Sequence, residues 1–585
     1  MNIKENISQL VKSSVERLYQ LDNVALEIQE NKSEFEGDFT VVIFPLVKQI
    51  RKNPELIGHE IGEDLVQNED AVVAFNVVKG FLNLKLVDNF FVTYFNTIKN
   101  NLDTITKKDE TVMVEYSSPN TNKPLHLGHI RNNLLGFSVA NILKEDGFNV
   151  IKTQIINDRG IHICKSMLAW EKFGNGETPA SARKKGDKLA GDYYVKFDQL
   201  YKSEISELVS EGISEDEAKK KAPSILEAQD MLVKWEQEDP QVRNLWSTMN
   251  EWVYEGFNQT YKRLGVAFDQ VQYESNTYIL GKDLIKEGLS KGVFYQKEDG
   301  SVWIDLTEEG LDHKLLLRSD GTSVYMTQDL GTAVERFKDN DIQRLIYTVG
   351  NEQDYHFQVL FLVLKKLGYD WAEHLYHLSY GMVELPEGKM KSREGTVVDA
   401  DDLMEEMYQT AKSKAQELGK MDQMSDEEKE ASYESVGIGA LKYFMLKVDP
   451  KKKMLFNPAE SIDFNGNTGP FIQYTYARIQ SLLTKGEYKG AVVETYLPNE
   501  TEKELIILNG NYKDVVKKAA EALSPALVAN YVYDLVKAYN SFYQSNPILN
   551  QENDIKEFRL DLSNLTAVTI KKALGLLGIG VVNRM

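Results

Sequence analysis

Two histidines three residues apart, His126 and His129, lie on either side of Gly128 in the polar segment SSPNTNKPLHLGHIRNN, residues 117–133. Imidazole groups can hydrogen-bond phosphate oxygens, and a glycine between them leaves room for a nucleotide to approach. A zinc site would need two more ligands, and no cluster of cysteines and histidines supplies them. The spacing is therefore compatible with phosphate chemistry, with a turn capped by two histidines as the structural alternative.

The elements around this segment favour the phosphate interpretation. Residues 111–116 (TVMVEY) are β-branched and apolar and predict a short buried strand. Residues 130–147 repeat apolar side chains at helical spacing and end on Gly147. Strands and helices alternate again downstream, which predicts an α/β domain with a doubly wound parallel sheet. Ligands bind such sheets where strands end and helices begin, and a helix N-terminus favours phosphate.

A second stretch could act on the same phosphates. The glycine-rich segment 381–398 contains KMKSR, residues 389–393, with Lys389, Met390 and Lys391. Lysines on such a loop can neutralise the charge that builds on a leaving pyrophosphate. The alternative is an ordinary basic surface loop.

The segment 117–129 resembles the HIGH-motif region of class I aminoacyl-tRNA synthetases, and specifically that of arginyl-tRNA synthetases. KMKSR is similar to the KMSKS loop of the same class, although Ser392 stands where the family has its second lysine. In arginyl enzymes a lysine ahead of HIGH compensates, and Lys123 fits that role. The resemblance implies a Rossmann-like catalytic domain. The implied catalytic residues are His126, His129, Lys123, Lys389 and Lys391, and the implied ATP-binding residues are His126, Gly128, His129, His356, Lys389 and Met390.

The resemblance also implies an arginine pocket. Tyr325 and Asp329 are four residues apart, so on a helix they face the same way, and in the family this pair contacts the guanidinium. A carboxylate and a hydroxyl suit a planar guanidinium. The residues expected at the α-amino and carboxylate end of arginine are Glu115, Ser118, Asn120, His129 and Gln353. The alternative for each is a satisfied polar residue at a strand end.

Several domains are expected in a chain of 585 residues. Residues 1–110 predict a small α/β domain similar to the additional N-terminal domain of arginyl-tRNA synthetases, with a strand at 38–46. The catalytic domain is expected at 111–400, interrupted by a charged helical insertion at about 170–272 and resuming at the strand 302–306 (VWIDL). Connecting helices at 401–464 precede an all-α bundle at 465–585, which resembles the family's anticodon-binding domain from GNTGPFIQYTYARIQSLL onward.

Aromatic residues in the first and last domains could stack on tRNA bases. The candidates are Phe81, Tyr474, Tyr476 and Arg478, although Tyr476 occupies a position where the family has histidine. Core packing is the alternative for each ring. The net charge of −21 argues mildly against an RNA-binding protein, but phosphate contacts depend on local patches, and the motifs outweigh it.

The leading hypothesis is ATP-dependent ligation of L-arginine to its tRNA through an arginyl adenylate. ATP is expected with Mg²⁺ as its substrate complex, without a tightly bound protein-ligated metal. No apolar run reaches the length of a membrane span, and Cys164 is the single cysteine, so we expect a cytoplasmic protein without membrane contact, acting as a monomer. The alternatives are another class I synthetase, a small-molecule nucleotidylyltransferase and a catalytically inactive tRNA-binding scaffold.

Overall fold

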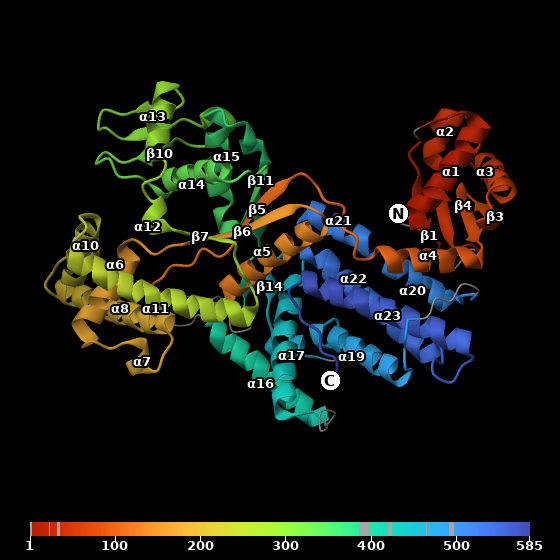
Figure 1. Ribbon diagram of the computed structural model, residues 1–585. Helices are drawn as coiled ribbons and strands as arrows, with labels where there is room; N and C mark the ends of the chain where they lie inside the picture. The colour runs from red at the N-terminus through yellow and green to blue at the C-terminus, as the bar shows by residue number, and fades with distance from the viewer. Residues whose placement is uncertain are drawn as a thin grey trace.

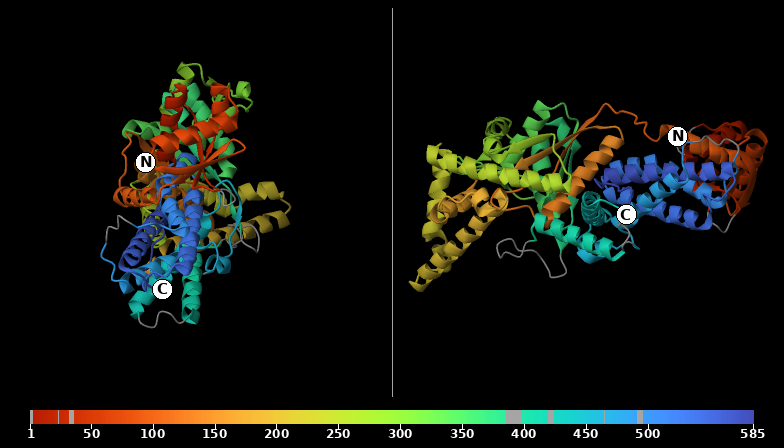
Figure 2. Two further views of the ribbon diagram at one scale, coloured as in Figure 1. Left: turned by 90° about the vertical axis from the view of Figure 1, so that its right-hand side faces the viewer. Right: turned by 60° about the horizontal axis from the view of Figure 1, so that its bottom comes forward.

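A computed structural model describes residues 3–22, 24–31, 36–384, 398–418, 424–463, 465–490 and 496–585. Figure 1 shows the N-terminal domain in red beside the blue C-terminal bundle, with the catalytic domain and its helical insertion at the other end. The elongated arrangement is clearest on the right of Figure 2. In the described part of the chain, no helix is long and apolar enough to cross a membrane.

The N-terminal domain is an antiparallel sheet covered by helices. Its strands, in the order β1-β2-β4-β3, are Glu27–Glu30, Phe39–Val42, Phe81–Leu86 and Val72–Val78. Its helices are α1 (Ile3–Tyr19), α2 (Phe44–Ile50) and α3 (Pro54–Asn68). The strand expected at 38–46 was wrong in its second half, because α2 begins at Phe44. Pro45 lies in the first turn of this helix, where a missing N–H costs nothing.

The catalytic domain is built on a five-stranded sheet whose strands are all parallel, in the order β12-β11-β5-β6-β7. These strands are Leu375–Tyr380, Arg344–Gly350, Thr111–Glu115, Asn149–Ile156 and Gln270–Tyr273. The helices α5 (Leu127–Glu145), α14 (Tyr325–Asp339) and α15 (Asp354–Lys366) pack on this domain. The strands that follow β5 in the chain, β6 and β7, lie on one side of it, and the later strands β11 and β12 lie on the other. The order in which strands are added therefore reverses at β5. The predicted doubly wound fold is confirmed.

The helical insertion lies between β6 and β7. Its helices α6 to α11 are Ile161–Phe173, Pro179–Ala182, Gly186–Ser210, Glu215–Lys221, Pro223–Glu236 and Pro240–Leu264. They enclose a hydrophobic cluster of their own, which includes Met167, Tyr193 and Phe197. The end expected for the insertion, residue 272, falls inside β7, so the sheet resumes earlier than predicted.

The segment 302–306, expected to resume the parallel sheet, does not join it. Val302–Ile304 is β9 of a small antiparallel sheet with β8 (Tyr295–Gln296) and β10 (Lys314–Leu317). The turn Asp299–Gly300 between β8 and β9 favours this local pairing. The short helices near it are α12 (Glu274–Thr277), α13 (Lys282–Ser290), η1 (Thr307–Glu309), η2 (Asn351–Gln353) and η3 (Asp370–His374).

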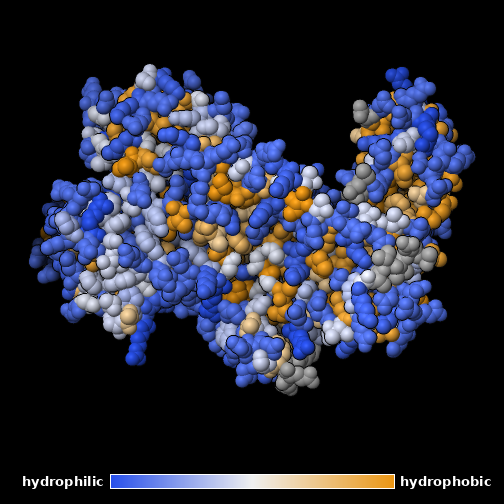
Figure 3. All heavy atoms as spheres, viewed as in Figure 1, coloured by the Kyte–Doolittle hydropathy of each residue, from blue (hydrophilic) through white to orange (hydrophobic). Residues whose placement is uncertain are grey.

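The C-terminal half is helical. Its elements are α16 (Ala400–Leu418), α17 (Asp426–Leu446), α18 (Pro458–Ser461), α19 (Gly469–Lys485), α20 (Glu500–Gly510), α21 (Tyr512–Ala522), α22 (Pro525–Ser545) and α23 (Asn553–Leu576), with β13 (Val383–Glu384) parallel to β14 (Met454–Leu455). Helix α4 (Asp88–Asn101) joins the N-terminal domain to this bundle, where Lys99 Nζ lies 2.5 Å from Asp561 Oδ2. Hydrophilic side chains cover most of the face in Figure 3, with hydrophobic residues also showing over the N-terminal domain.

Candidate active site

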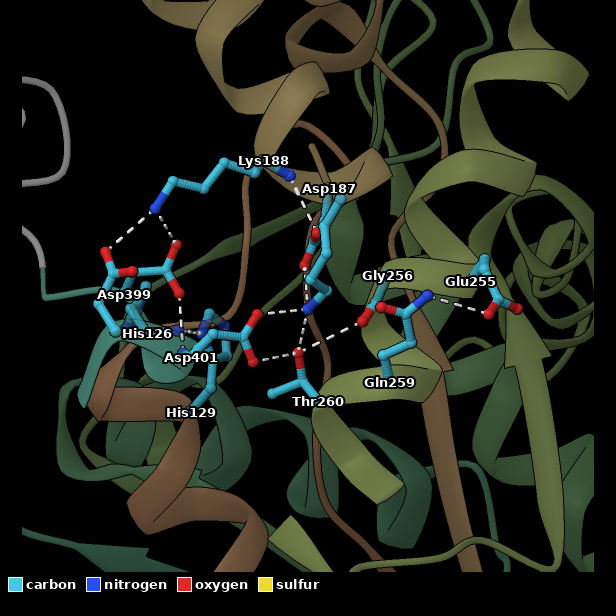
Figure 4. Close-up of polar contacts among 12 residues, drawn as sticks. His126, His129, Asp187, Lys188, Glu255, Gly256, Gln259, Thr260, Asp399 and Asp401 are labelled. Carbon is cyan, nitrogen blue, oxygen red and sulfur yellow. Dashed lines mark hydrogen bonds and ion pairs between the residues drawn. The ribbon is translucent and has the colours of Figure 1, made fainter. Parts of the chain in front are cut away.

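His126 and His129 hold each other in place at the start of α5. The His126 Nδ1 accepts a hydrogen bond from Gly128 N at 3.1 Å, and His129 Nδ1 accepts one from His126 N at 3.1 Å. The ring centroids are 3.9 Å apart (Figure 4). An Nδ1 that accepts cannot carry the ring proton, so each neutral ring carries it on Nε2. Both rings therefore offer an N–H donor at a helix N-terminus.

Burial keeps these rings neutral. It lowers the pKa of His126 to about 4, helped by the charge of Lys123. The pKa of His129 is also lowered well below its ordinary value, by burial first and then by the neighbouring His126 and Lys123. At neutral pH the pair therefore donates hydrogen bonds without adding positive charge.

Lys123 lines the same cavity as His126. The cavity has a volume of about 450 Å³ and extends between the segment 120–126, helix α8 and the start of α16. Burial lowers the pKa of Lys123. Lys389, Met390 and Lys391 fall in residues 385–397, outside the described part of the chain, so their predicted roles stay predictions.

Both ends of the segment 385–397 are tied to α5 or to the residues just before it. On the far side, Leu127 N donates to Val398 O at 3.1 Å, and Ala400 N donates to Leu125 O at 2.9 Å. On the near side, β13 pairs with β14. Arg131 of α5 donates to Pro450 O and Lys452 O, just before β14, at 3.0 and 2.9 Å. Helix α5 and the residues just before it therefore carry the HLGH motif and also hold the described residues on both sides of 385–397.

Asn132, which the sequence reasoning missed, joins three strand ends. Its Oδ1 accepts from Ser117 N at 2.6 Å, and its Nδ2 donates to Thr348 O at 2.6 Å and to Tyr380 OH at 3.2 Å. Ser117 has a left-handed backbone, with φ of 65°, just where β5 ends. This turn leads into the exposed Ser118 and Asn120, and Asn120 forms a β-bridge with Asn157 after β6.

Tyr325 and Asp329 lie in the first turn and a half of α14, as their spacing predicted. The Tyr325 side chain is 72% exposed. His356, which was expected near ATP, contacts Asp329, with Nε2 at 2.7 Å from Oδ2. Gln353 lies exposed in η2, directly before the helix that carries His356. These four residues therefore lie in the first turns of α14, in η2 and at the start of α15.

Glu274, at the start of α12, is a second carboxylate near Asp329 that the sequence reasoning missed. Helix α12 contacts α14, and the turn after it packs so tightly there that a Cβ on Gly281 would meet Thr327 O at 2.0 Å. Burial raises the pKa of Glu274 to about 7, against the charge of Arg159, with Asp158 and Asp329 raising it further. Among the described residues, its carboxylate has no ion pair. A buried acid that feels the charge of Arg159 but forms no ion pair with it can still accept a cationic ligand.

Asp158 fixes the position of α12. Its carboxylate accepts hydrogen bonds from Ser275 N at 2.8 Å, from Ser275 Oγ at 2.7 Å and from the Tyr254 hydroxyl at 2.7 Å. Asp158 follows β6, and Ser275 follows Glu274 directly in the chain. Asp158, at the end of β6, therefore fixes the position of Glu274, which follows β7.

Glu115, expected at the α-amino group of arginine, is buried and forms an ion pair with Arg336 of α14. This buried pair joins the end of β5 to the helix that carries Tyr325 and Asp329. A direct contact between Glu115 and arginine stays a prediction, whereas its effect on the position of α14 is plain from the pair.

The candidate tRNA residues differ in exposure. Phe81 is 37% exposed and makes an edge contact with Phe44, whose ring centroid is 5.7 Å away. The Arg478 guanidinium lies 5.0 Å from the Tyr474 ring. Tyr476 is 6% exposed and belongs to the hydrophobic core, so the expectation that its ring stacks on a base was wrong.

Three family models together match most of the chain. The model described as tRNA synthetases class I (R), catalytic domain, matches residues 93–457, the arginyl tRNA synthetase N terminal domain matches 2–86, and the DALR anticodon binding domain matches 472–585. An arginine–tRNA ligase of Flavobacterium psychrophilum is 59% identical over the full length of both chains. The chain belongs to the arginyl-tRNA synthetase family.

Another relative in the arginyl-tRNA synthetase family, from Bacteroides thetaiotaomicron, is 57% identical over the full length of both chains. Solved structures support the fold. The arginyl-tRNA synthetase of Thermus thermophilus superposes with a TM-score of 0.77 at 23% identity, covering all of both chains. That of Plasmodium falciparum gives 0.75 at 20% identity and covers all of this chain and 99% of the other.

Proposed function

We propose that this chain attaches L-arginine to its tRNA in two steps. The arginine carboxylate attacks the α-phosphate of ATP, forming arginyl adenylate and releasing pyrophosphate. A terminal ribose hydroxyl of the tRNA then attacks the adenylate carbonyl, and AMP leaves. The observation that carries this proposal is the pair of carboxylates, Asp329 and Glu274, gathered beside the sheet whose central strand leads into the two histidine donors.

The carboxylates select arginine by charge. A guanidinium presents N–H donors in a plane and can meet two acids at once. Tyr325 adds a hydroxyl one helical turn before Asp329. Ser118, Asn120 and Gln353 are exposed and able to hold the α-amino and carboxylate groups. The carboxylates also argue against synthetases for uncharged amino acids.

The histidines act on the phosphates. Their Nε2–H groups are fixed before ATP arrives, because each Nδ1 is already occupied. Donors that need no reorientation stabilise the charge that grows on the α-phosphate and on pyrophosphate. Lys123, beside them in the cavity, adds a positive charge. Together with Lys389 and Lys391 it would neutralise the leaving group.

Magnesium would enter with ATP as part of the substrate. In the described residues, no group of three or more His, Cys, Asp or Glu side chains is arranged to hold a metal ion. Mg²⁺ commonly binds substrate phosphates together with water and one or two carboxylates, which fits this mode of entry.

The N-terminal domain and the C-terminal bundle would bind the tRNA. Phe81 and Phe44 offer exposed aromatic rings, and Tyr474 with Arg478 offers a ring beside a cation. The family match over 472–585 supports an anticodon-binding role for the bundle. A nucleotidylyltransferase acting on small molecules would not need such a domain. We further propose that the enzyme acts as a monomer.

ATP–pyrophosphate exchange with each amino acid, with and without tRNA, tests the function. We expect exchange with arginine and only background exchange with the other amino acids. Since Ser392 replaces the second lysine of the KMSKS loop, we expect exchange to require tRNA. Exchange driven by another amino acid would contradict the proposal. Full exchange with arginine in nuclease-treated enzyme would contradict only the tRNA requirement.

A further inference from the structure

The insertion helix α8 begins with two lysines in an unfavourable place for its own dipole. Lys185 is the N-cap residue, and Lys188 lies in the first turn. The N-terminus of a helix carries partial positive charge, so lysines there weaken the helix unless something else compensates. Here the compensation comes from carboxylates at the start of α16 (Figure 4).

Apart from a contact of Lys185 with Asp187 of α8 at 3.5 Å, the described ion pairs of these two lysines are with residues 399–402. Lys188 Nζ lies 3.3 Å from Asp399 Oδ2 and 3.0 Å from Asp402 Oδ2. Lys185 pairs with Asp401, and its Nζ also donates to Thr260 Oγ1 of α11 at 2.6 Å. Thr260 Oγ1 in turn donates to the other Asp401 oxygen at 3.0 Å. Helices α8 and α11 of the insertion therefore both bind the residues at the start of α16.

The residues that these lysines bind lie beside the HLGH motif. Asp399 forms an antiparallel bridge with His126. Asp399 lies six residues after Arg393, the last residue of KMKSR, and Val398 is the first described residue after 385–397. Lys188, Asp399 and Asp402 line the same cavity as Lys123 and His126. The ion pairs of α8 therefore involve the residue, Asp399, that pairs with His126 of the HLGH motif.

The start of α8 is closely packed against α11. A Cβ on Gly186 would meet Trp252 O at 2.1 Å, and one on Gly256 would meet Asp187 Oδ1 at 2.5 Å. The start of α8 is therefore packed directly against α11, where only glycine fits. The ion pairs themselves are partly exposed, with Lys188 43% and Asp402 69% accessible, so they add little to stability. Their placement matters more than their strength.

We propose that Lys185 and Lys188 are positioning residues for adenylate formation. Through Asp399, Asp401 and Asp402 they fix the position at which the KMKSR segment rejoins the fold beside His126. The helical insertion thereby acts on the first chemical step without touching arginine, whose pocket lies on α12 and α14. This inference rests on the proposed adenylation reaction.

The test compares Lys188→Glu, the swap Lys188→Glu with Asp402→Lys, and a control, Lys202→Ala. Lys202 is on the same helix, and its ion pair within the described part of the chain is local, with Asp198 at 2.7 Å. We expect Lys188→Glu to lower kcat for arginine-dependent exchange about tenfold, because small misplacements of catalytic groups cost that much or more. KM for arginine and the Tm should stay close to those of the parent. The swap should recover most of kcat, and Lys202→Ala should match the parent.

An unchanged kcat in Lys188→Glu would overturn the inference, and so would a loss that follows a lowered Tm and is not recovered by the swap. These outcomes are distinct from failure of the proposed function. If the parent enzyme shows no arginine-dependent exchange, the function itself is wrong, and the variants cannot rescue it.

Discussion

Asp329 accepts a hydrogen bond from His356, with 2.7 Å between Oδ2 and Nε2. A carboxylate can only accept, so the histidine must be the donor. Two helices that follow different strands thus meet at one carboxylate. His356 orients Asp329 through Oδ2 only, so Oδ1 remains able to accept from a ligand. The predicted contact of His356 with ATP stays a prediction.

Replacing Asp329 by alanine should raise KM for arginine at least about 30-fold, since loss of the charged partner of a buried guanidinium costs roughly 2–5 kcal/mol. Tyr325→Phe removes one hydroxyl and should do less damage. Steady-state exchange at varied arginine measures both. Asp339→Ala, an exposed carboxylate at the other end of α14, is the control. Normal arginine kinetics in Asp329→Ala would exclude this pocket.

Arginine affinity should rise with pH through about 7. The pKa of Glu274 is raised to about 7, so the side chain is protonated below that pH, whereas a guanidinium binds its charged form. Binding should therefore expel a proton, and Kd should weaken about tenfold from pH 8 to pH 6. Calorimetry in buffers of different ionisation enthalpy detects the proton. Glu274→Gln should bind more weakly at pH 8 and lose this pH dependence.

His126→Ala and His129→Ala should each slow adenylate formation by about 150-fold, on the order of 3 kcal/mol, with tRNA affinity nearly intact. At saturating arginine, kcat should show no histidine inflection near pH 6.5, because the pKa of His126 is lowered to about 4 and that of His129 is also lowered. Rapid-quench kinetics and filter binding measure the two effects. A collapse of tRNA affinity would show that the motif serves RNA binding instead.

Phe81→Ala should weaken tRNA binding by about 1–3 kcal/mol, or 5- to 150-fold, if the exposed ring stacks on one base. KM for arginine should not change, because the N-terminal domain is remote from the pocket (Figure 1). Phe173→Ala in the insertion, with a ring of similar exposure, is the control. Equal tRNA affinity in both variants would argue that Phe81 only covers its own domain.

The sequence predicted what depends on local pattern. The strand before HLGH, the helix after it and the shared face of Tyr325 and Asp329 all follow from short-range spacing, and the structure has them. The prediction that Tyr476 is exposed for stacking was wrong, although the helical spacing of the three residues could have shown this. Residues two apart on a helix point about 200° from each other, so Tyr474 and Arg478 share a face that excludes Tyr476.

What could not be predicted depends on contacts between distant parts of the chain. Glu274 follows a short strand and looks like any turn residue until α12 packs on α14. Asn132 lies among apolar residues of α5, and only the sheet shows that it joins β11 and β12. Arg336 pairs with Glu115 across 221 residues. No periodicity reports such pairs.

The position of β5 has a consequence for the order in which the protein is made. β5 can pair with β6 as soon as both have left the ribosome, but its other edge has no partner until β11 is made, where Val112 pairs with Arg344. During that interval the insertion can fold alone around its own hydrophobic cluster. The unpaired edge of β5 meanwhile remains open to wrong partners. A nascent chain that stops before Arg344 therefore has its histidines and its insertion, yet lacks β11, the strand that completes the site.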